Sequence, residues 1–249
     1  MSDPRATNPY ATQRAGLDAA NPAALGVKPD ARLSAAFLTQ AFLWMFVGLL
    51  LSAGVAFVTQ ANPSLVQFAA NNYLILIIAQ FALVMAISFG INRISASVAL
   101  LLFFVYAASL GLVLGIIVAS FSAAGQQASV VTAFLSASAI FGSAAIYGAV
   151  TKRSLTNLGG ILFMGLIGLI VAMVLNIFLQ SSQLTWIISI IGVLIFTALT
   201  AYDVQRIQNG TIAVATGSME KAAVIGALTL YLDFINIFFF LLRLFGGNR

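Results

Sequence analysis

Beyond residue 33, long apolar segments alternate along the chain with short polar ones. Seven of the segments are long enough to cross a hydrocarbon core, which takes about 20 residues with a range near 17–25. Turn-like stretches such as GINRIS, TKRSLTN and QSSQ separate them. The predicted spans are Ser34–Thr59, Tyr73–Phe89, Ser97–Ser120, Ala128–Val150, Leu158–Leu179, Leu184–Tyr202 and a last one that ends near Phe245. The pattern predicts an all-α, multi-pass membrane protein with seven transmembrane helices.

Residues 1–33 have a different character. They hold four of the five prolines and charges of both signs, without apolar periodicity. We therefore expect a disordered tail over 1–33 and a membrane domain over 34–249. The tail lacks the basic segment followed directly by an apolar one that marks a signal peptide, so we expect it to stay on the mature protein.

Composition supports the membrane assignment and narrows the chemistry. Hydrophobic residues make up 61% of the chain and charged residues 7%, whereas a soluble domain carries about 25% charged residues. Cysteine and histidine are both absent, which removes thiolate chemistry, the usual proton shuttle and the commonest metal ligand. We expect neither enzymatic activity nor a bound cofactor.

Basic residues alternate between the two sides of the predicted membrane domain. The tail holds four of them, and the second–third, fourth–fifth and sixth–seventh connections hold one, two and two. These nine are Arg5, Arg14, Lys28, Arg32, Arg93, Lys152, Arg153, Arg206 and Lys221. The positive-inside rule makes their side, and the N-terminus, cytoplasmic. Such scattered charges are topology signals, and no nucleic-acid partner is expected.

Arg243 and Arg249, near the C-terminus, fall on the opposite side of this pattern. They leave a re-entrant last segment open as an alternative to a full span.

Only two of the six acidic residues lie next to hydrocarbon. Asp203 and Asp233 are these two; Asp3, Asp18 and Asp30 lie in the tail and Glu220 in a connection. An aspartate at the middle of a membrane helix costs about 2.5–3.5 kcal/mol, and such residues are functional candidates for that reason.

Asp233 belongs to a polar stripe on the last span. With a rotation of about 100° per residue, Thr229, Asp233, Asn236 and Arg243 share an arc of roughly 80°, and Phe240 is the aromatic residue within it. Such a stripe should face protein or water. Arg243 is ~15 Å from Asp233 along the axis, so a partner for Asp233 must come from another helix.

Asp203, at the cytoplasmic end of the sixth span, is the candidate partner. The two acids come within reach if the embedded part of the last span starts at Leu228, and are separated if it starts at Ala222. Two carboxylates that meet cannot both ionise without a large cost, so the pair should share one proton near neutral pH. A shared proton closes the site, whereas its loss, or entry of a divalent cation such as Ca²⁺, separates the helices.

A structural alternative explains the same two residues. Asp203 and Arg206 are three residues apart and can pair on one helix. Asp233 can remain protonated and hydrogen-bond a neighbouring helix. Arg93 is a topology anchor or a latch for the site, and the GxxxG pair Gly111 and Gly115 indicates close helix packing more strongly than a hinge or a dimer contact.

Two stretches carry a resemblance to a known family. AYDVQRIQ at Ala201–Gln208, followed by ALTLYLDFINIFFFLLRLFG at Ala227–Gly246, resembles the bacterial branch of the Bax inhibitor-1 family, and the likeness covers about residues 33–246. It implies a seven-helix fold with the last helix central in the bundle. It also implies a pH-sensitive calcium leak in the cytoplasmic membrane, controlled by Asp203 and Asp233.

In this reading the two aspartates form the gate and pH sensor and contact calcium transiently, with Arg93, Arg206 and Asn236 as ancillary residues. Membrane lipids and calcium ions are the expected partners. Some bacterial relatives are linked to a membrane-anchored ATP-dependent protease. The alternative function is therefore a non-transporting interaction protein that modulates such a protease and stress survival.

Overall fold

The computed structural model describes residues 31–246, and over this range the chain forms helices and no strand. The tail predicted over 1–33 lies outside the described residues, except that its last three residues begin the first helix. The helices are α2 (Ala31–Ala61), α3 (Pro63–Asn71), α4 (Tyr73–Gly90), α5 (Ala96–Ala123), α6 (Gln127–Val150), α7 (Leu158–Leu179), α8 (Ser182–Gln208), α9 (Thr211–Thr216) and α10 (Met219–Gly246).

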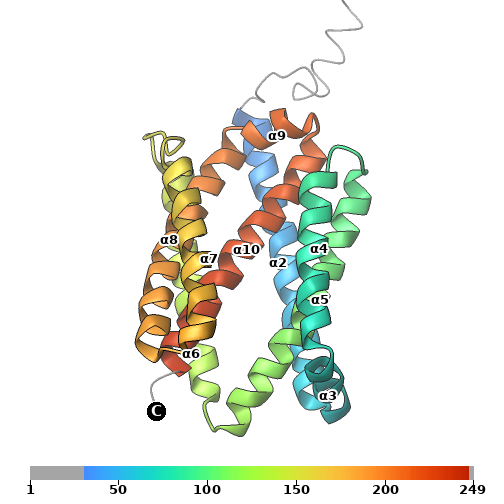
Figure 1. The fold of residues 1–249 in the computed structure, drawn as a ribbon. Helices are drawn as coiled ribbons and strands as arrows, with labels where there is room; N and C mark the ends of the chain where they lie inside the picture. Colours follow the sequence, from blue (N-terminus) through green and yellow to red (C-terminus); the bar gives the residue numbers. More distant parts are fainter. Residues whose placement is uncertain (1–30, 247–249) are drawn as a thin grey trace, which may run out of the picture.

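The seven predicted spans are confirmed. Helices α2, α4, α5, α6, α7, α8 and α10 are each long and apolar enough to cross a membrane. They run alternately up and down, so that the α4–α5, α6–α7 and α8–α10 connections lie at one end of the bundle (Figure 1). Arg206 and Lys221, predicted in the last of these connections, lie instead in the last turn of α8 and the first turn of α10. Helix α10 is a single unbroken helix of 28 residues that ends at the opposite end of the bundle, as a full span requires.

Two short helices lie in connections for which no helix was predicted. Helix α3 forms in QANPSLVQFAANN because Asn62 caps it, its side-chain oxygen accepting from Ser64 N at 3.0 Å, and Pro63 stands in the first turn, where its missing N–H has no cost. Helix α9 lies between Gly210 and Gly217, both with φ near +60°, and packs against α8 and α10.

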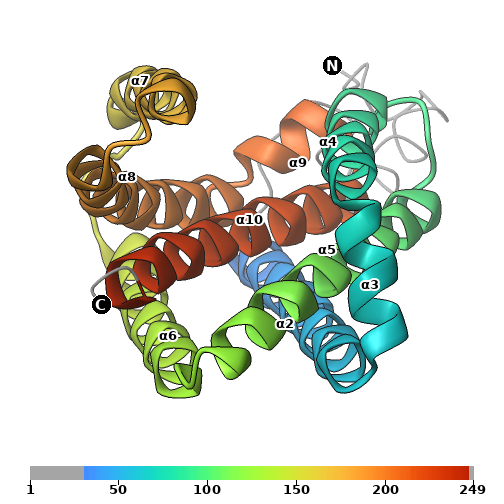
Figure 2. The ribbon, with the colours of Figure 1, turned by 60° about the horizontal axis from the view of Figure 1, so that its bottom comes forward.

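Helix α10 is the most buried span. In its most apolar 18-residue stretch 72% of residues are buried, against 6% in α7. It contacts α2, α5, α6 and α8 and lies between α8 and α2, whereas α7 packs on the side of α8 away from it (Figure 2). The full central position implied by the family resemblance stays a prediction.

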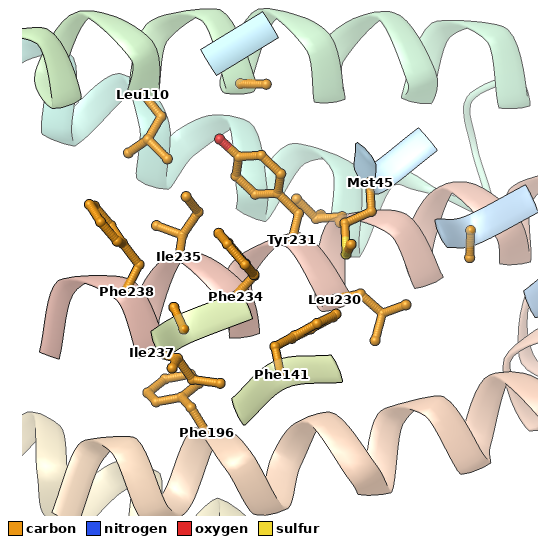
Figure 3. Packing of buried hydrophobic residues seen from close by; sticks show 14 of the residues in the cluster. Met45, Leu110, Phe141, Phe196, Leu230, Tyr231, Phe234, Ile235, Ile237 and Phe238 are labelled. Atoms are coloured by element: carbon orange, nitrogen blue, oxygen red, sulfur yellow. The ribbon is translucent and has the colours of Figure 1, made fainter. Parts of the chain in front are cut away.

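Aromatic and aliphatic side chains of α10 form much of the core. Tyr231, Phe234 and Phe238 extend from α10 among the neighbouring spans (Figure 3). Tyr231 is fully buried and meets Phe103 of α5 edge-on, with ring centroids 5.5 Å apart. Ser52 of α2 lies 2.6 Å from the Tyr231 hydroxyl and donates to the Ala107 carbonyl of α5 at 2.7 Å. This cluster links α2, α5 and α10.

The small residues of α5 serve packing within the chain. A side chain at Gly111 would overlap Val55 and the Ser52 carbonyl, and one at Gly115 would overlap Thr59. Both glycines therefore allow α5 to approach α2 closely, which confirms the packing interpretation of the GxxxG pair.

Candidate functional site

Asp203 lies near the end of α8 and is paired on its own helix. The residue is buried, 5% exposed, and Arg206 Nη1 donates to Asp203 Oδ1 at 3.2 Å. The Arg206 guanidinium also stands over the Tyr202 ring, 5.3 Å from its centroid. The structural alternative for Asp203 is thus confirmed: the (i, i+3) pair predicted from the spacing forms.

Asp233 lies in the middle of α10 and is 3% exposed. It faces α8, where the Thr200 hydroxyl and the Asp203 carboxylate are close enough to interact with its carboxyl group. Thr200 Oγ1 donates its own proton to the Phe196 carbonyl at 2.8 Å. Asp233 Oδ2 is fully buried and has no hydrogen-bond partner within residues 31–246.

The register of the α8–α10 contact brings the two acids together. Asp203 is five residues from the end of α8, or ~7.5 Å along the axis, while Asp233 is 14 residues into α10, or ~21 Å. The first turns of α10 therefore extend past the end of α8, where α9 packs against them. This placement agrees with an embedded part of α10 that starts after its first turns.

The two carboxyl groups have different surroundings. Arg206 offsets the charge on Asp203, whereas the salt bridges within residues 31–246 leave Asp233 without a cation. Because a buried carboxylate that has an unpaired oxygen and no cation beside it is costly, the arrangement favours a proton on Asp233. A protonated carboxyl group can donate to the lone pairs of Thr200, which an ionised one cannot do.

Two ancillary candidates lie apart from this pair. Arg93 is exposed in the α4–α5 turn, where its backbone N–H donates to Gly90 O at 2.8 Å, and it forms no ion pair with a described residue. Asn236 lies on the same stripe as Asp233, but its Nδ2 donates to Leu232 O at 2.8 Å on its own helix.

Gln205 is a residue whose role the sequence did not indicate. Its buried side chain accepts from Leu155 N at 2.7 Å and donates to Arg153 O at 2.9 Å. It thereby fastens the α6–α7 connection to α8, two residues after Asp203. The sequence did show a polar residue in an apolar helix. It could not show the partners of that residue, because they are main-chain atoms of a connection distant in the chain.

The same part of α8 packs tightly against α6 and α7. Gly148 of α6 has the Ala201 carbonyl directly against it, and Gly159 at the start of α7 lies against the Tyr202 hydroxyl. The segment that carries Asp203 is therefore also held by close contacts with α6 and α7.

Comparison with known proteins matches the sequence to one family. The sequence model of the family described as inhibitor of apoptosis-promoting Bax1 matches residues 34–249. The inner membrane protein YbhL of Escherichia coli K12 is 42% identical over 229 residues, covering 90% of this chain and 96% of that protein. An uncharacterized protein of Deinococcus radiodurans is 42% identical over 86% of this chain and 90% of its own length. One of Borreliella burgdorferi is 40% identical over 86% and 92%.

Proposed function

Since the chain belongs to the Bax inhibitor-1 family, we propose that it is a pH-sensitive calcium leak of a bacterial cytoplasmic membrane, gated by Asp203 and Asp233. The observation that carries the proposal is the buried carboxyl oxygen of Asp233 that has no hydrogen-bond partner. It lies in the contact between α8 and α10, here called the seam, which also holds Asp203. A buried carboxyl group that lacks a cation changes its interactions with the facing helix when it loses its proton.

The closed state has one proton on the pair, carried by Asp233. Asp203 is ionised and is offset by Arg206. When Asp233 loses its proton, two negative charges face each other across the contact between α8 and α10, and their repulsion separates the helices. The leak therefore increases as pH rises.

Calcium is the proposed permeant ion. When α8 and α10 separate, the groups open to an ion are the carboxylate oxygens of the aspartates and the hydroxyl oxygen of Thr200, and Ca²⁺ accepts irregular oxygen geometry. Within residues 31–246 no three acidic side chains cluster together. Two carboxylates supply fewer oxygens than the six to eight that a resident calcium ion takes, so contact during passage is transient.

The orientation follows from charge. The α4–α5 turn with Arg93, the α6–α7 connection with Lys152 and Arg153, and the first turn of α10 with Lys221 lie at the end of the bundle nearer Asp203. By the positive-inside rule this end faces the cytoplasm, and so does the N-terminus. The E. coli relative is an inner membrane protein, which supports the same membrane for this chain.

Calcium uptake into proteoliposomes tests the proposal. Asp233→Asn keeps the shape of the side chain and removes its titration, so uptake should no longer depend on pH. Glu220→Gln is the matched control, because Glu220 is an exposed acidic residue of the same helix, and this variant should retain the wild-type pH curve. Uptake that is insensitive to pH in the wild type, or unaltered by Asp233→Asn, would refute the proposal.

The second function is a non-transporting partner of a membrane-anchored ATP-dependent protease. Its support is the polar, proline-rich sequence of residues 1–30, which a protease could engage. Deletion of residues 1–30 should abolish capture of the protease and leave uptake unchanged. Protease capture combined with no calcium uptake by any variant would favour this function over the leak.

A further inference from the structure

The contact between α8 and α10 continues beyond the aspartates toward the opposite end of the bundle. On α8, Gly192, Phe196, Thr200 and Asp203 share one helical face and meet α10, and Ser189 and Thr185 continue that face toward the start of the helix. On α10 the facing stripe is Thr229, Asp233, Asn236, Phe240 and Arg243. Both stripes are otherwise polar or small, and each contains one aromatic residue.

The two aromatic residues meet. The ring centroids of Phe196 and Phe240 are 6.0 Å apart, and the two side chains are 7% and 3% exposed. Phe196 extends from α8 toward α10 (Figure 3). A side chain at Gly192 would meet the Phe240 ring at 2.5 Å, so this glycine lets the ring lie against the backbone of α8.

The order of contacts along the seam places this aromatic pair between two polar regions. Asp233 meets Thr200 and Asp203 on one side. Phe240 is seven residues further along α10, or ~10 Å. Beyond it, a pocket of about 630 Å³ opens between the start of α8 and the end of α10, lined by Ser182, Gln183, Thr185, Trp186, Ile187, Arg243 and Leu244.

We infer that Phe196 and Phe240 form a second, apolar closure of the ion path, in series with the aspartate pair. The inference rests on the proposed function. Hydrophobic constrictions close channels because water leaves a narrow apolar passage, and a hydrated cation cannot cross it. The pocket at Arg243 is then the outer vestibule, and the aromatic pair separates it from the aspartates.

The closure predicts a specific effect on calcium uptake. Phe240→Ala and Phe196→Ala should each raise uptake several-fold at a pH where the wild-type leak is low, and uptake should still increase with pH because the aspartates are unchanged. Phe239→Ala is the matched control, since Phe239 is the adjacent residue, half-buried and away from the seam. Arg243 stands over the Phe240 ring at 5.8 Å. Phe240→Ala also removes this contact with Arg243, whereas Phe196→Ala does not. An increase in uptake that both variants share is therefore due to loss of the closure.

A second pair of variants separates an apolar closure from simple loss of packing. Leucine and asparagine have similar shapes, but the amide of asparagine holds water. Phe240→Leu should stay near wild type, whereas Phe240→Asn should leak several-fold more, with both proteins monodisperse in detergent. Equal uptake by these two variants, or alanine variants that match Phe239→Ala, would overturn the inference.

The outcome also distinguishes this inference from the function on which it rests. If Asp233→Asn abolishes the pH dependence while the Phe240 variants match the control, the aspartate gate stands and the aromatic closure is wrong. If wild type and Asp233→Asn pass no calcium at any pH but Phe240→Asn does, the closure stands and the leak function is wrong. If no variant passes calcium, both are wrong.

Discussion

Arg206 Nη1 lies 3.2 Å from Asp203 Oδ1, so the guanidinium group beside the two aspartates is paired with the aspartate on its own helix. Asp233, on the facing helix, has Thr200 and Asp203 as its polar neighbours. The site is therefore asymmetric: one aspartate has a compensating charge, and the other is suited to carry the proton. The sequence led us to expect that the pair shares one proton, and it did not indicate which aspartate would carry it.

This asymmetry predicts how Arg206 sets the pH response. A positive charge beside the pair favours its ionised form, so Arg206→Gln favours the protonated, closed form, and a higher pH is needed to open it. The midpoint of the uptake curve should move to higher pH. The shift should be smaller than about one pH unit, because a partly exposed ion pair contributes about 0.2–1 kcal/mol and one unit corresponds to about 1.4 kcal/mol.

The measurement is calcium uptake across a pH series, with Lys152→Gln as the control. Lys152 carries the same charge at the same end of the bundle, but it is exposed in the α6–α7 connection. A midpoint that moves to lower pH in Arg206→Gln, or moves equally in both variants, contradicts the assigned role.

Gln205 should control how firmly the α6–α7 connection is held. Gln205→Leu removes the bonds to Leu155 N and Arg153 O, and leaving such groups unpaired costs about 1–3 kcal/mol. Because Lys152 and Arg153 are exposed, trypsin reports the loosened connection directly. Cleavage there should be faster than in the wild type, and the unfolding temperature in detergent should fall.

Gln208→Leu provides the comparison for this experiment. Gln208 is half-buried one turn later on α8 and has no bond to the connection. Trypsin cleavage at equal rates in the two variants would show that Gln205 does not hold the connection.

The spans were predictable because hydrocarbon thickness imposes their length and apolar composition. The pairing of Asp203 with Arg206 was predictable from spacing on one helix. The register between α8 and α10 was not, because it depends on where α10 begins, and the sequence allowed starts that differ by several residues. The packing of α9 against α8 and the first turns of α10 fixes this register, which places Asp233 opposite Thr200.

Other features depend on contacts between distant segments. The meeting of Phe196 with Phe240 requires the same register, although Phe240 was recognisable as the aromatic member of a polar stripe. Helix α3 was not predicted because its nine residues fall below the length of a span, although Asn62 and Pro63 are residues typical of a helix start.

The hydroxyl cluster of α2, α5 and α10 predicts an order of effects. Tyr231→Phe removes one bond and leaves Ser52 paired with Ala107 O. Ser52→Ala removes both interhelical bonds and leaves the Tyr231 hydroxyl buried without a partner. Interhelical hydrogen bonds in membranes average about 0.6 kcal/mol, and an orphaned buried group costs about 1–3 kcal/mol. Ser52→Ala should therefore destabilise the protein more than Tyr231→Phe.

Thermal unfolding in one detergent measures the difference. Ser138→Ala is the control, because the Ser138 hydroxyl donates to Phe134 O at 2.8 Å on its own helix, and its removal should have little effect. The reverse order, with Tyr231→Phe the more damaging, would mean that Ser52 does not join the three helices.

The glycines predict opposite signs for the same substitution. Gly148→Ala places a methyl group against the Ala201 carbonyl, a main-chain atom that cannot rotate away, so α6 and α8 must separate. Overpacking of this kind typically costs about 1–3 kcal/mol.

Gly168→Ala, on the open face of α7, has no heavy atom within 4 Å of the new methyl group. It should be neutral or stabilising by up to about 1 kcal/mol, because alanine favours the helix. Unfolding curves recorded under identical conditions decide between the two signs, and destabilisation of equal size at both positions would show that the close approach of α6 to α8 is not the cause. Because Ala201 is two residues before Asp203, the separation forced by Gly148→Ala should also alter the pH dependence of calcium uptake, and Gly168→Ala should leave that curve unchanged.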